Sequence, residues 1–207
     1  MKLLVLSLLW LFFCISHSFL ISNKVHGYVQ ANYPGLVKYY RILYNIFSGL
    51  IFLIAAAYGY YIADKPFFVF SGYYQIISVG MIIIALLIFI AGSIKYDLKT
   101  FAGISQLITK QKQILVNDTN MLTITGIHKY IRHPYYTATF LLIWSRNLDM
   151  SALITNLILS LYLIVGTYLE EKKLTDYFGE TYRIYKNNVS MYIPLKYIKK
   201  TIIKPKD

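Results

Sequence analysis

Two short polar segments in the second half of the chain carry residue types that can bind a charged ligand. In the first, Arg132 and His133 precede Pro134, and proline suits the first turn of a helix because its missing N–H costs nothing there. Arg132 and His133 then lie at the positive end of that helix, where an arginine fork matches a carboxylate or a phosphate. In the second, Glu170 and Glu171 end an apolar run, and acids close to a membrane core need a cationic partner or ligand. Together with nearby tyrosines, the segments suit a ligand with a carboxylate, a cationic centre and an aromatic base.

Each of these residues also has an ordinary structural role that the sequence leaves open. Arg132 can anchor the chain at the membrane interface, where basic residues gather. His133 can be a hydrogen-bonded structural residue, and the two glutamates can pair with Lys172 or Lys173, a contact that contributes little at a helix end. The tyrosines near the ends of the apolar runs fit an aromatic belt as well as a ligand cage. The functional prediction therefore depends on the pattern as a whole rather than on any one residue.

The composition indicates that these segments belong to an integral membrane protein. The 207 residues are 57% hydrophobic and 14% charged, with a mean hydropathy of +0.51, whereas soluble domains carry about 25% charged residues. A disulfide scaffold is excluded because Cys14 is the only cysteine. We expect an all-α integral membrane helical bundle with about five transmembrane helices and a short cytoplasmic C-terminal helical segment. The apolar runs that predict the spans are 3–21, 42–62, 73–94 and 148–169, with a short fifth at 135–144.

The basic residues predict how the bundle lies in the membrane. Most of the 21 Lys and Arg fall in the segments 23–41 and 95–133 and after residue 169. These segments share one side of the membrane if the short run 135–144 crosses it, and basic loops face the cytoplasm. We therefore expect five spans, with the N-terminus outside and the C-terminus in the cytoplasm. The first run lacks an A-x-A-like cleavage site, so we interpret it as a retained span rather than a signal peptide.

Several other kinds of site do not fit the sequence. His128 and His133 are five residues apart, which is not the spacing of two metal ligands on one helix face, and no second cysteine is present. We therefore predict no metal. No two of the 11 glycines are two residues apart, so the G-x-G-x-x-G turn of the Rossmann fold is absent. The basic residues are scattered, which predicts contact with membrane lipids and no nucleic-acid partner. His17, inside the first run, is expected to be hydrogen-bonded within the bundle.

The order and spacing of the motifs resemble the isoprenylcysteine carboxyl methyltransferase superfamily of integral membrane enzymes. The resemblance runs from Gly126 through Arg132-His133-Pro134-x-Tyr136 and an apolar helix pair to Glu170-Glu171-x-x-Leu174-x-x-x-Phe178-Gly179-x-x-Tyr182-x-x-Tyr185 and Pro194. A looser match in the first half resembles the NnrU/nurim branch, which includes the bacterial methanethiol S-methyltransferases. The residues of that looser match are Trp10, His17-Ser18, Tyr40-Arg41, Tyr44-Asn45, Asp97, Gly103 and Gln106.

The resemblance implies S-adenosylmethionine as the cofactor, which has a carboxylate, an amino group, a cationic sulfonium and an adenine. It also implies that Arg132, His133, Pro134 and Tyr136 shape the cofactor pocket, and that Glu170, Glu171, Tyr182 and Tyr185 close it from the other side. Two residues are expected to be catalytic, since His133 is the candidate base and Arg132, or else Arg41, can lower the pKa of a thiol acceptor. Residues 1–207 then form a single methyltransferase-like membrane domain, with three N-terminal spans (1–94), a cytoplasmic link (95–134), the last two spans (135–169) and a cytoplasmic tail (170–207) that completes the cofactor site.

The function implied by the resemblance is a membrane S-adenosylmethionine-dependent methyltransferase. S-methylation of a small thiol such as methanethiol is the favoured reaction. Carboxyl methylation of a prenylated cysteine, or methylation of another lipophilic acceptor, stays open, because a carboxylate acceptor needs no base. A non-catalytic membrane protein of the NnrU/nurim kind stays open as well. Retention of costly buried charge at Arg132, His133, Glu170 and Glu171 counts against that last alternative.

Overall fold

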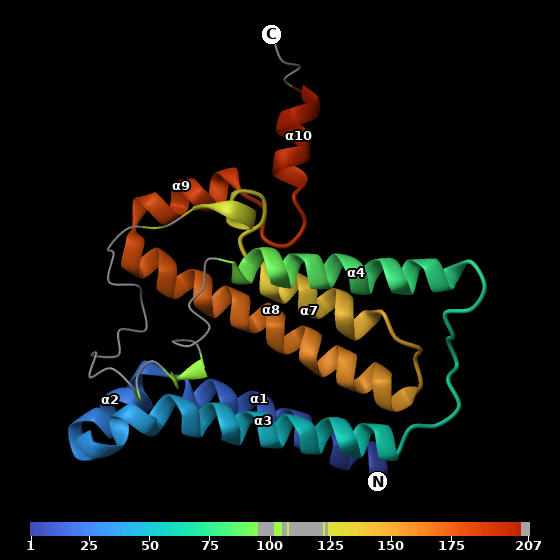
Figure 1. The fold of residues 1–207 in the computed structure, drawn as a ribbon, viewed down its shortest axis with the longest axis horizontal. Coiled ribbons are helices and arrows are strands. Elements are labelled where there is room, and N and C mark those ends of the chain that lie inside the picture. The colour runs from blue at the N-terminus through green and yellow to red at the C-terminus, as the bar shows by residue number, and fades with distance from the viewer. Residues whose placement is uncertain (95–101, 105–106, 108–121, 123, 204–207) are drawn as a thin grey trace. The chain divides into compact units, whose positions relative to one another are not determined.

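The computed structural model describes residues 1–94, 102–104, 107, 122 and 124–203, and the chain is helical through most of them (Figure 1). Within these residues, β-type pairing is limited to two isolated bridges. The prediction of an all-α fold is therefore confirmed. The helices are α1 (Lys2–Leu20), α2 (Asn23–Asn32), η1 (Pro34–Leu36), α3 (Val37–Tyr61), α4 (Tyr74–Ser93), η2 (Gly126–Lys129), α7 (Pro134–Trp144), α8 (Met150–Phe178), α9 (Glu180–Asn188) and α10 (Leu195–Ile203).

Four helical segments in the described part of the chain are long and apolar enough to cross a membrane. In α4, for example, Ala85 and Gly92 are the buried residues, whereas Ile76, Ile83 and Leu87 are exposed. A helix that is apolar all round and lies largely outside a protein core suits contact with lipid. The membrane bundle predicted from the long apolar runs is thus supported by Lys2–Leu20, Pro34–Tyr61, Tyr74–Ser93 and Met150–Phe178.

The short apolar run 135–144 forms α7, which has 11 residues. At ~1.5 Å per residue, a helix of this length rises about 16 Å, roughly half of the hydrocarbon thickness of a bilayer. The fifth span, the sides on which the termini lie and the cytoplasmic placement of the tail therefore stay predictions. Asp97 and Gln106, and most of the link around them, lie outside the described residues.

The chain divides into two compact units. The first comprises the described residues of 1–69, 96–115 and 147–162, and the second those of 70–95, 116–146 and 163–207. Helix α8 therefore contributes its first part to one unit and its second part to the other. The single domain over residues 1–207 stays a prediction.

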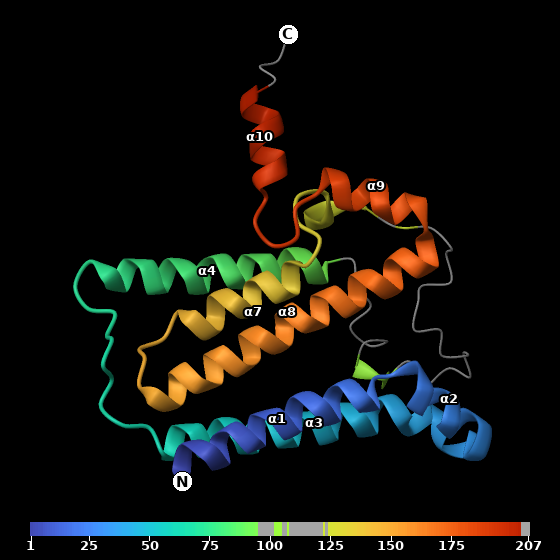
Figure 2. The same cartoon turned by 180° about the vertical axis from the view of Figure 1, so that it is seen from behind.

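The first unit is built on an antiparallel hairpin of α1 and α3 (Figures 1 and 2). Leu6 and Trp10 are buried in it, and Gly59 allows close packing, since a Cβ there would lie 3.3 Å from Leu6 Cδ1. The indole Nε1 of Trp10 donates to Thr155 Oγ1 at 2.9 Å. This bond satisfies a polar group that would be costly to leave unpaired away from water.

Residues of the looser N-terminal motif also lie in the first unit. Gly103 has a φ of +91°, and a Cβ there would lie 2.8 Å from the backbone nitrogen of Ile42. Asn45 Nδ2 donates to the carbonyl oxygen of Ala102 at 3.2 Å, so this part of the link packs on the start of α3. The ring of His17 stacks on that of Phe13. The buried Nδ1 of His17 has no hydrogen-bond partner among the described residues, so the bond expected for it is not found there.

In the second unit, α7 packs along α4. Gly92 makes this approach possible, because a Cβ there would lie 3.0 Å from Tyr135 Cζ. At the other end of the contact, the hydroxyl of Ser78 donates to the carbonyl oxygen of Ser145. Between α8 and α9, Gly179 has a φ of +57°, a backbone conformation that favours glycine. These contacts fix α7 along α4, and the turn at Gly179 leads from α8 into α9.

Candidate functional site

Backbone hydrogen bonds hold the segment before α7 against the segment that follows α9. The N–H of Arg132 donates to the carbonyl oxygen of Ser190 at 2.9 Å, and that of His133 donates to Met191 at 3.1 Å. His133 is the N-cap residue of α7, and the buried Pro134 is in its first turn, as the sequence predicted. Because proline has no N–H to satisfy, this position leaves no donor unpaired.

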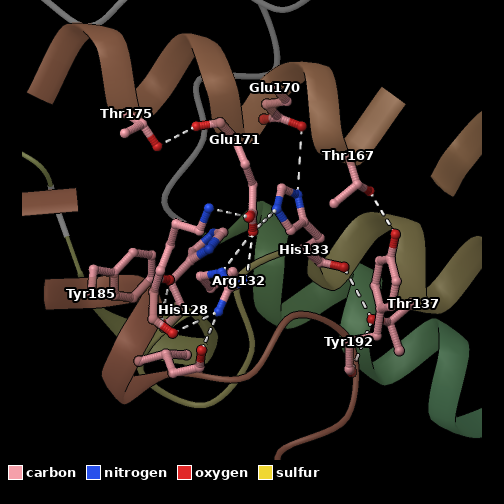
Figure 3. A network of polar contacts seen from close by, with 12 residues as sticks. His128, Arg132, His133, Thr137, Thr167, Glu170, Glu171, Thr175, Tyr185 and Tyr192 are labelled. Atoms are coloured by element: carbon pink, nitrogen blue, oxygen red, sulfur yellow. Dashed lines mark hydrogen bonds and ion pairs between the residues drawn. The ribbon is translucent and has the colours of Figure 1, made fainter. Parts of the chain in front are cut away.

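Arg132 and Glu171 form a buried ion pair at the centre of this arrangement (Figure 3). Arginine Nε donates to Glu171 Oε1 at 2.7 Å, and the second terminal nitrogen lies 2.7 Å from the same oxygen. The side chains are 6% and 3% exposed. The other terminal nitrogen donates to the carbonyl oxygens of Lys186 and Val189. The guanidinium therefore links the end of α8 to the C-terminal end of α9.

The carboxylate of Glu171 contacts three basic side chains. Besides Arg132, the Nε2 atom of His133 lies 3.1 Å from Oε1, and the ammonium of Lys186 lies 3.1 Å from Oε2. Burial of a lone carboxylate costs several kcal/mol, and close pairing with good hydrogen bonds offsets that cost. The cationic partner that the sequence predicted for the acidic pair is thus present within the protein itself.

Both ring nitrogens of His133 face carboxylates. Nε2 contacts Glu171, and Nδ1 lies 3.5 Å from Glu170 Oε2. A neutral imidazole can donate to one of these carboxylates, and an imidazolium can donate to both. A general base must instead face the proton that it removes. The geometry therefore shows His133 as a bridge between two glutamates, and its role as a base stays a prediction.

Glu170 is the exposed member of the cluster. Its side chain is 47% exposed, compared with 3% for Glu171. Among the described residues, His133 is the ion-pair partner found for it, and neither glutamate pairs with Lys172 or Lys173 in that part of the chain. Glu170 therefore keeps acceptor capacity for a cation or a hydroxyl group of a ligand.

An aromatic group adjoins the ionic cluster. The ring of Tyr136 stacks on that of His133, with centroids 5.5 Å apart and planes at 15°. Tyr192 lies on another side, where its hydroxyl donates to Thr167 Oγ1 at 2.7 Å and its carbonyl oxygen accepts from Thr137 Oγ1 at 3.1 Å. Burial raises the pKa of Tyr192, so the phenol stays a donor. The sequence did not single out Tyr192, although it lies two residues before the motif's last proline.

Tyr182 and Tyr185 lie in a small core with Val189 rather than in the ionic cluster. Tyr182 is 1% exposed, and burial together with the nearby charge of Glu171 raises its pKa. The hydroxyl of Tyr185 donates to the carbonyl oxygen of His128 at 2.7 Å. In this structure both tyrosines fix α9 in place, and their contact with a cofactor stays a prediction.

Lys186 is a member of the cluster that the sequence did not single out. Its carbonyl oxygen accepts from Arg132 and, at 2.7 Å, from the ammonium of Lys196, while its own ammonium binds Glu171. The spacing in the sequence could have indicated it, because Lys186 lies four residues after Tyr182 and therefore on the same face of a helix. With 37% of its side chain exposed, Lys186 is the cation at the surface of the cluster.

The residues present fit parts of S-adenosylmethionine on chemical grounds. The half-exposed carboxylate of Glu170 can accept hydrogen bonds from an amino group or ribose hydroxyls, and the partly exposed ring of Tyr136 offers an aromatic face. Arg132 is engaged by Glu171 and two carbonyl groups, so its direct contact with a ligand carboxylate stays a prediction. No set of three His, Cys, Asp or Glu residues in the described ranges is arranged to hold a metal ion.

The fold and this cluster define a class of protein, namely an all-α membrane protein in which an ionic cluster joins the start of α7 to the later part of α8 and to α9. Known proteins share part of its sequence. A methanethiol S-methyltransferase of Pseudomonas deceptionensis is 38% identical over 69 residues, which are 33% of this chain and 26% of that protein. The methanethiol S-methyltransferase 1 of Bradyrhizobium diazoefficiens is 38% identical over 69 residues, 33% of this chain and 24% of the relative.

A third relative is named for a different methyl acceptor, a prenylated cysteine. The protein-S-isoprenylcysteine O-methyltransferase of Schizosaccharomyces pombe is 33% identical over 85 residues, which cover 38% of this chain and 35% of that protein. The chain thus spans only about a quarter to a third of the length of these relatives. No protein-family model matches the chain, and no solved structure matches it significantly. The relatives support the isoprenylcysteine carboxyl methyltransferase-like superfamily, in agreement with the motifs.

Proposed function

We propose that the chain is a membrane methyltransferase that uses S-adenosylmethionine. The observation that carries this proposal is the carboxylate of Glu171, which is buried and contacts Arg132, His133 and Lys186. Such ionic clusters are costly at a membrane boundary and mark functional sites there. The names of the relatives supply the class of reaction.

In this proposal the residues of the cluster divide into two groups. S-adenosylmethionine, when bound, supplies an activated methyl group on a positively charged sulfur. Glu170 accepts hydrogen bonds from the polar groups of the cofactor, and the partly exposed ring of Tyr136 provides a face for its adenine. Arg132 and Lys186 act as positioning residues, because they hold Glu171 and through it the ends of α8 and α9. Transfer of the methyl group from this sulfur to an acceptor is a displacement at carbon. Positioning of the two reactants and exclusion of water help such a reaction.

We propose a small thiol such as methanethiol as the methyl acceptor. A thiol must react as its thiolate, and positive charge nearby lowers the pKa of the thiol. The basic side chains of the cluster can provide that charge. Two of the relatives are named for methanethiol. The carboxylate of a prenylated cysteine is the second candidate, because the relative from Schizosaccharomyces pombe is named for that substrate.

The test of the proposal is binding of radiolabelled S-adenosylmethionine to the purified protein in nanodiscs. Saturable binding is expected, and Glu170→Gln should weaken it strongly. Glu180→Gln is the matched control, since Glu180 is an exposed acid on α9 that pairs with Arg183. Absence of saturable binding to protein that is folded and monodisperse would contradict the proposal and favour a non-catalytic membrane protein.

The acceptor is tested next with the same preparation. Methanethiol and a prenylated cysteine are offered in parallel with labelled cofactor, and dimethyl sulfide or the methyl ester is measured by mass spectrometry. Dimethyl sulfide alone is the expected product. Formation of the ester alone would replace the first acceptor by the second while leaving the cofactor unchanged.

A further inference from the structure

Helix α10 has two faces of different chemistry. Leu195, Ile198 and Ile202 recur at a spacing that places them on one face of a helix. Their side chains are 56%, 43% and 73% exposed. Lys199 is exposed beside this stripe. The helix thus presents an apolar face with a basic edge to its surroundings.

The opposite face of α10 is fixed to the second unit. The ammonium of Lys196 donates to the carbonyl oxygen of Lys186 at 2.7 Å, and that of Lys200 donates to Asn188 Oδ1 at 3.0 Å. The ring of Tyr197 meets that of Tyr130 edge to face at 4.7 Å. These contacts set the rotation of α10 about its axis, so that the stripe of Leu195, Ile198 and Ile202 faces away from the unit.

The direction of α10 agrees with a position at a membrane surface. Helix α10 runs across the direction of α4 in both views (Figures 1 and 2), and α4 is apolar enough to span a membrane. A helix that crosses the direction of a spanning helix lies along the plane of the bilayer. Amphipathic helices in this plane bury their apolar face at the boundary between headgroups and acyl chains.

We propose that α10 is an interfacial helix bound to an anionic membrane surface, with Leu195, Ile198 and Ile202 in the acyl boundary and Lys199 at the headgroups. The helix contains no acid, and Lys199 beside the apolar stripe complements anionic lipids. A second copy of the chain would place like charges against one another. This inference goes beyond the proposed function and does not depend on it.

Site-directed spin labelling tests the proposal on the full chain. Single cysteines are introduced at 195 to 202 in a Cys14→Ala background, and nitroxide accessibility to oxygen and to a water-soluble nickel complex is measured. The nanodiscs contain equal parts of phosphatidylcholine and phosphatidylglycerol. We expect the oxygen-to-nickel ratio to follow a helical period, with maxima for Leu195→Cys, Ile198→Cys and Ile202→Cys.

Two results would overturn the proposal. Preferential access of the nickel complex to labels at 198 and 202 would mean that the stripe faces water. Exclusion of both reagents would mean that protein covers it, and spin–spin broadening would identify a second copy of the chain as that cover. Circular dichroism and size-exclusion chromatography establish that each labelled protein is folded, so a misfolded variant is not scored.

The charge of the lipid is tested separately. The ratio at Ile202→Cys should rise when phosphatidylglycerol is added to phosphatidylcholine nanodiscs, and Lys199→Glu should remove that rise. Lys173→Glu is the matched control, because Lys173 is an exposed lysine that lies on α8 and not on α10. A ratio that is independent of lipid charge, or equal effects of the two substitutions, would overturn the recognition of anionic lipid.

Discussion

Arg132 and Glu171 contact each other through two nitrogens of the guanidinium, and neither side chain is more than 6% exposed. The sequence predicted an anion-binding end at Arg132 and a cation-binding pair at the glutamates. In the structure these two ends bind each other. The ionic cluster is therefore preformed in the protein, and Glu170, at 47% exposure, is its outward-facing carboxylate.

The contrast between the adjacent glutamates gives a prediction on stability. Glu171→Gln should lower the free energy of unfolding by about 3–5 kcal/mol, because it leaves the buried guanidinium of Arg132 without its anionic partner. Glu170→Gln should change it by only about 0–1 kcal/mol, as expected for an exposed pair. The measurement is unfolding of the purified protein in mixed micelles of increasing denaturing detergent. Equal losses for the two variants would contradict the assignment of Glu171 as the buried member.

The contact between Arg132 and Glu171 predicts strong coupling in a double-mutant cycle. Arg132→Gln and Glu171→Gln should each destabilise the protein, and the double variant should lose less than the sum of the two by about 1–3 kcal/mol. Arg183 and Glu180 provide the matched control cycle, since they are 65% and 70% exposed at 3.4 Å and should couple by well under about 1 kcal/mol. Additive losses in the first cycle would mean that the two side chains do not form this pair.

Much of the fold followed from the sequence because lipid imposes a strong pattern on helices. Long apolar runs predicted four of the helices, and Pro134 predicted the start of α7. The short run at 135–144 carried less information, since its 11 residues suit a half-span as well as a buried helix. In the structure this helix packs on α4, and Gly92 allows the close approach. The role of Gly92 depends on Tyr135, which is far away in sequence.

The sequence indicated which residues come together in the candidate site better than it indicated how they contact one another. The motifs singled out Arg132, His133, Glu170 and Glu171, which the structure brings together. They did not indicate that Arg132 binds Glu171, because pairing between segments 39 residues apart depends on tertiary packing. For the same reason Lys186 was missed, as one lysine among many in a basic chain.

Close packing of α4 and α7 predicts an asymmetry between two glycines of α4. Gly92→Ala places a methyl group about where the ring of Tyr135 lies, with Cζ at 3.0 Å, and overpacking of this kind costs roughly 1–3 kcal/mol. Gly80→Ala meets no atom within 4 Å and should be neutral or stabilising by up to about 1 kcal/mol, because alanine favours helices. Detergent unfolding of the two variants measures the difference. Similar stability of both would contradict the contact between α4 and α7.

The stability of the protein should depend on pH through His128. This residue lies in η2, and its carbonyl oxygen accepts a hydrogen bond from the hydroxyl of Tyr185. Burial lowers the pKa of His128 in the folded protein below the ~6.5 of an unperturbed histidine. The unfolded chain therefore binds a proton more readily, so the contribution of the neutral ring to stability is complete above about pH 6.5 and is lost as the pH falls toward the lowered value. His128→Gln removes this dependence while keeping the backbone carbonyl that Tyr185 binds. The difference in unfolding free energy between wild type and variant should shrink as the solution is acidified through that range. Parallel stability curves for the two proteins would show that His128 titrates alike in the folded and unfolded states, and would remove the burial argument for this residue.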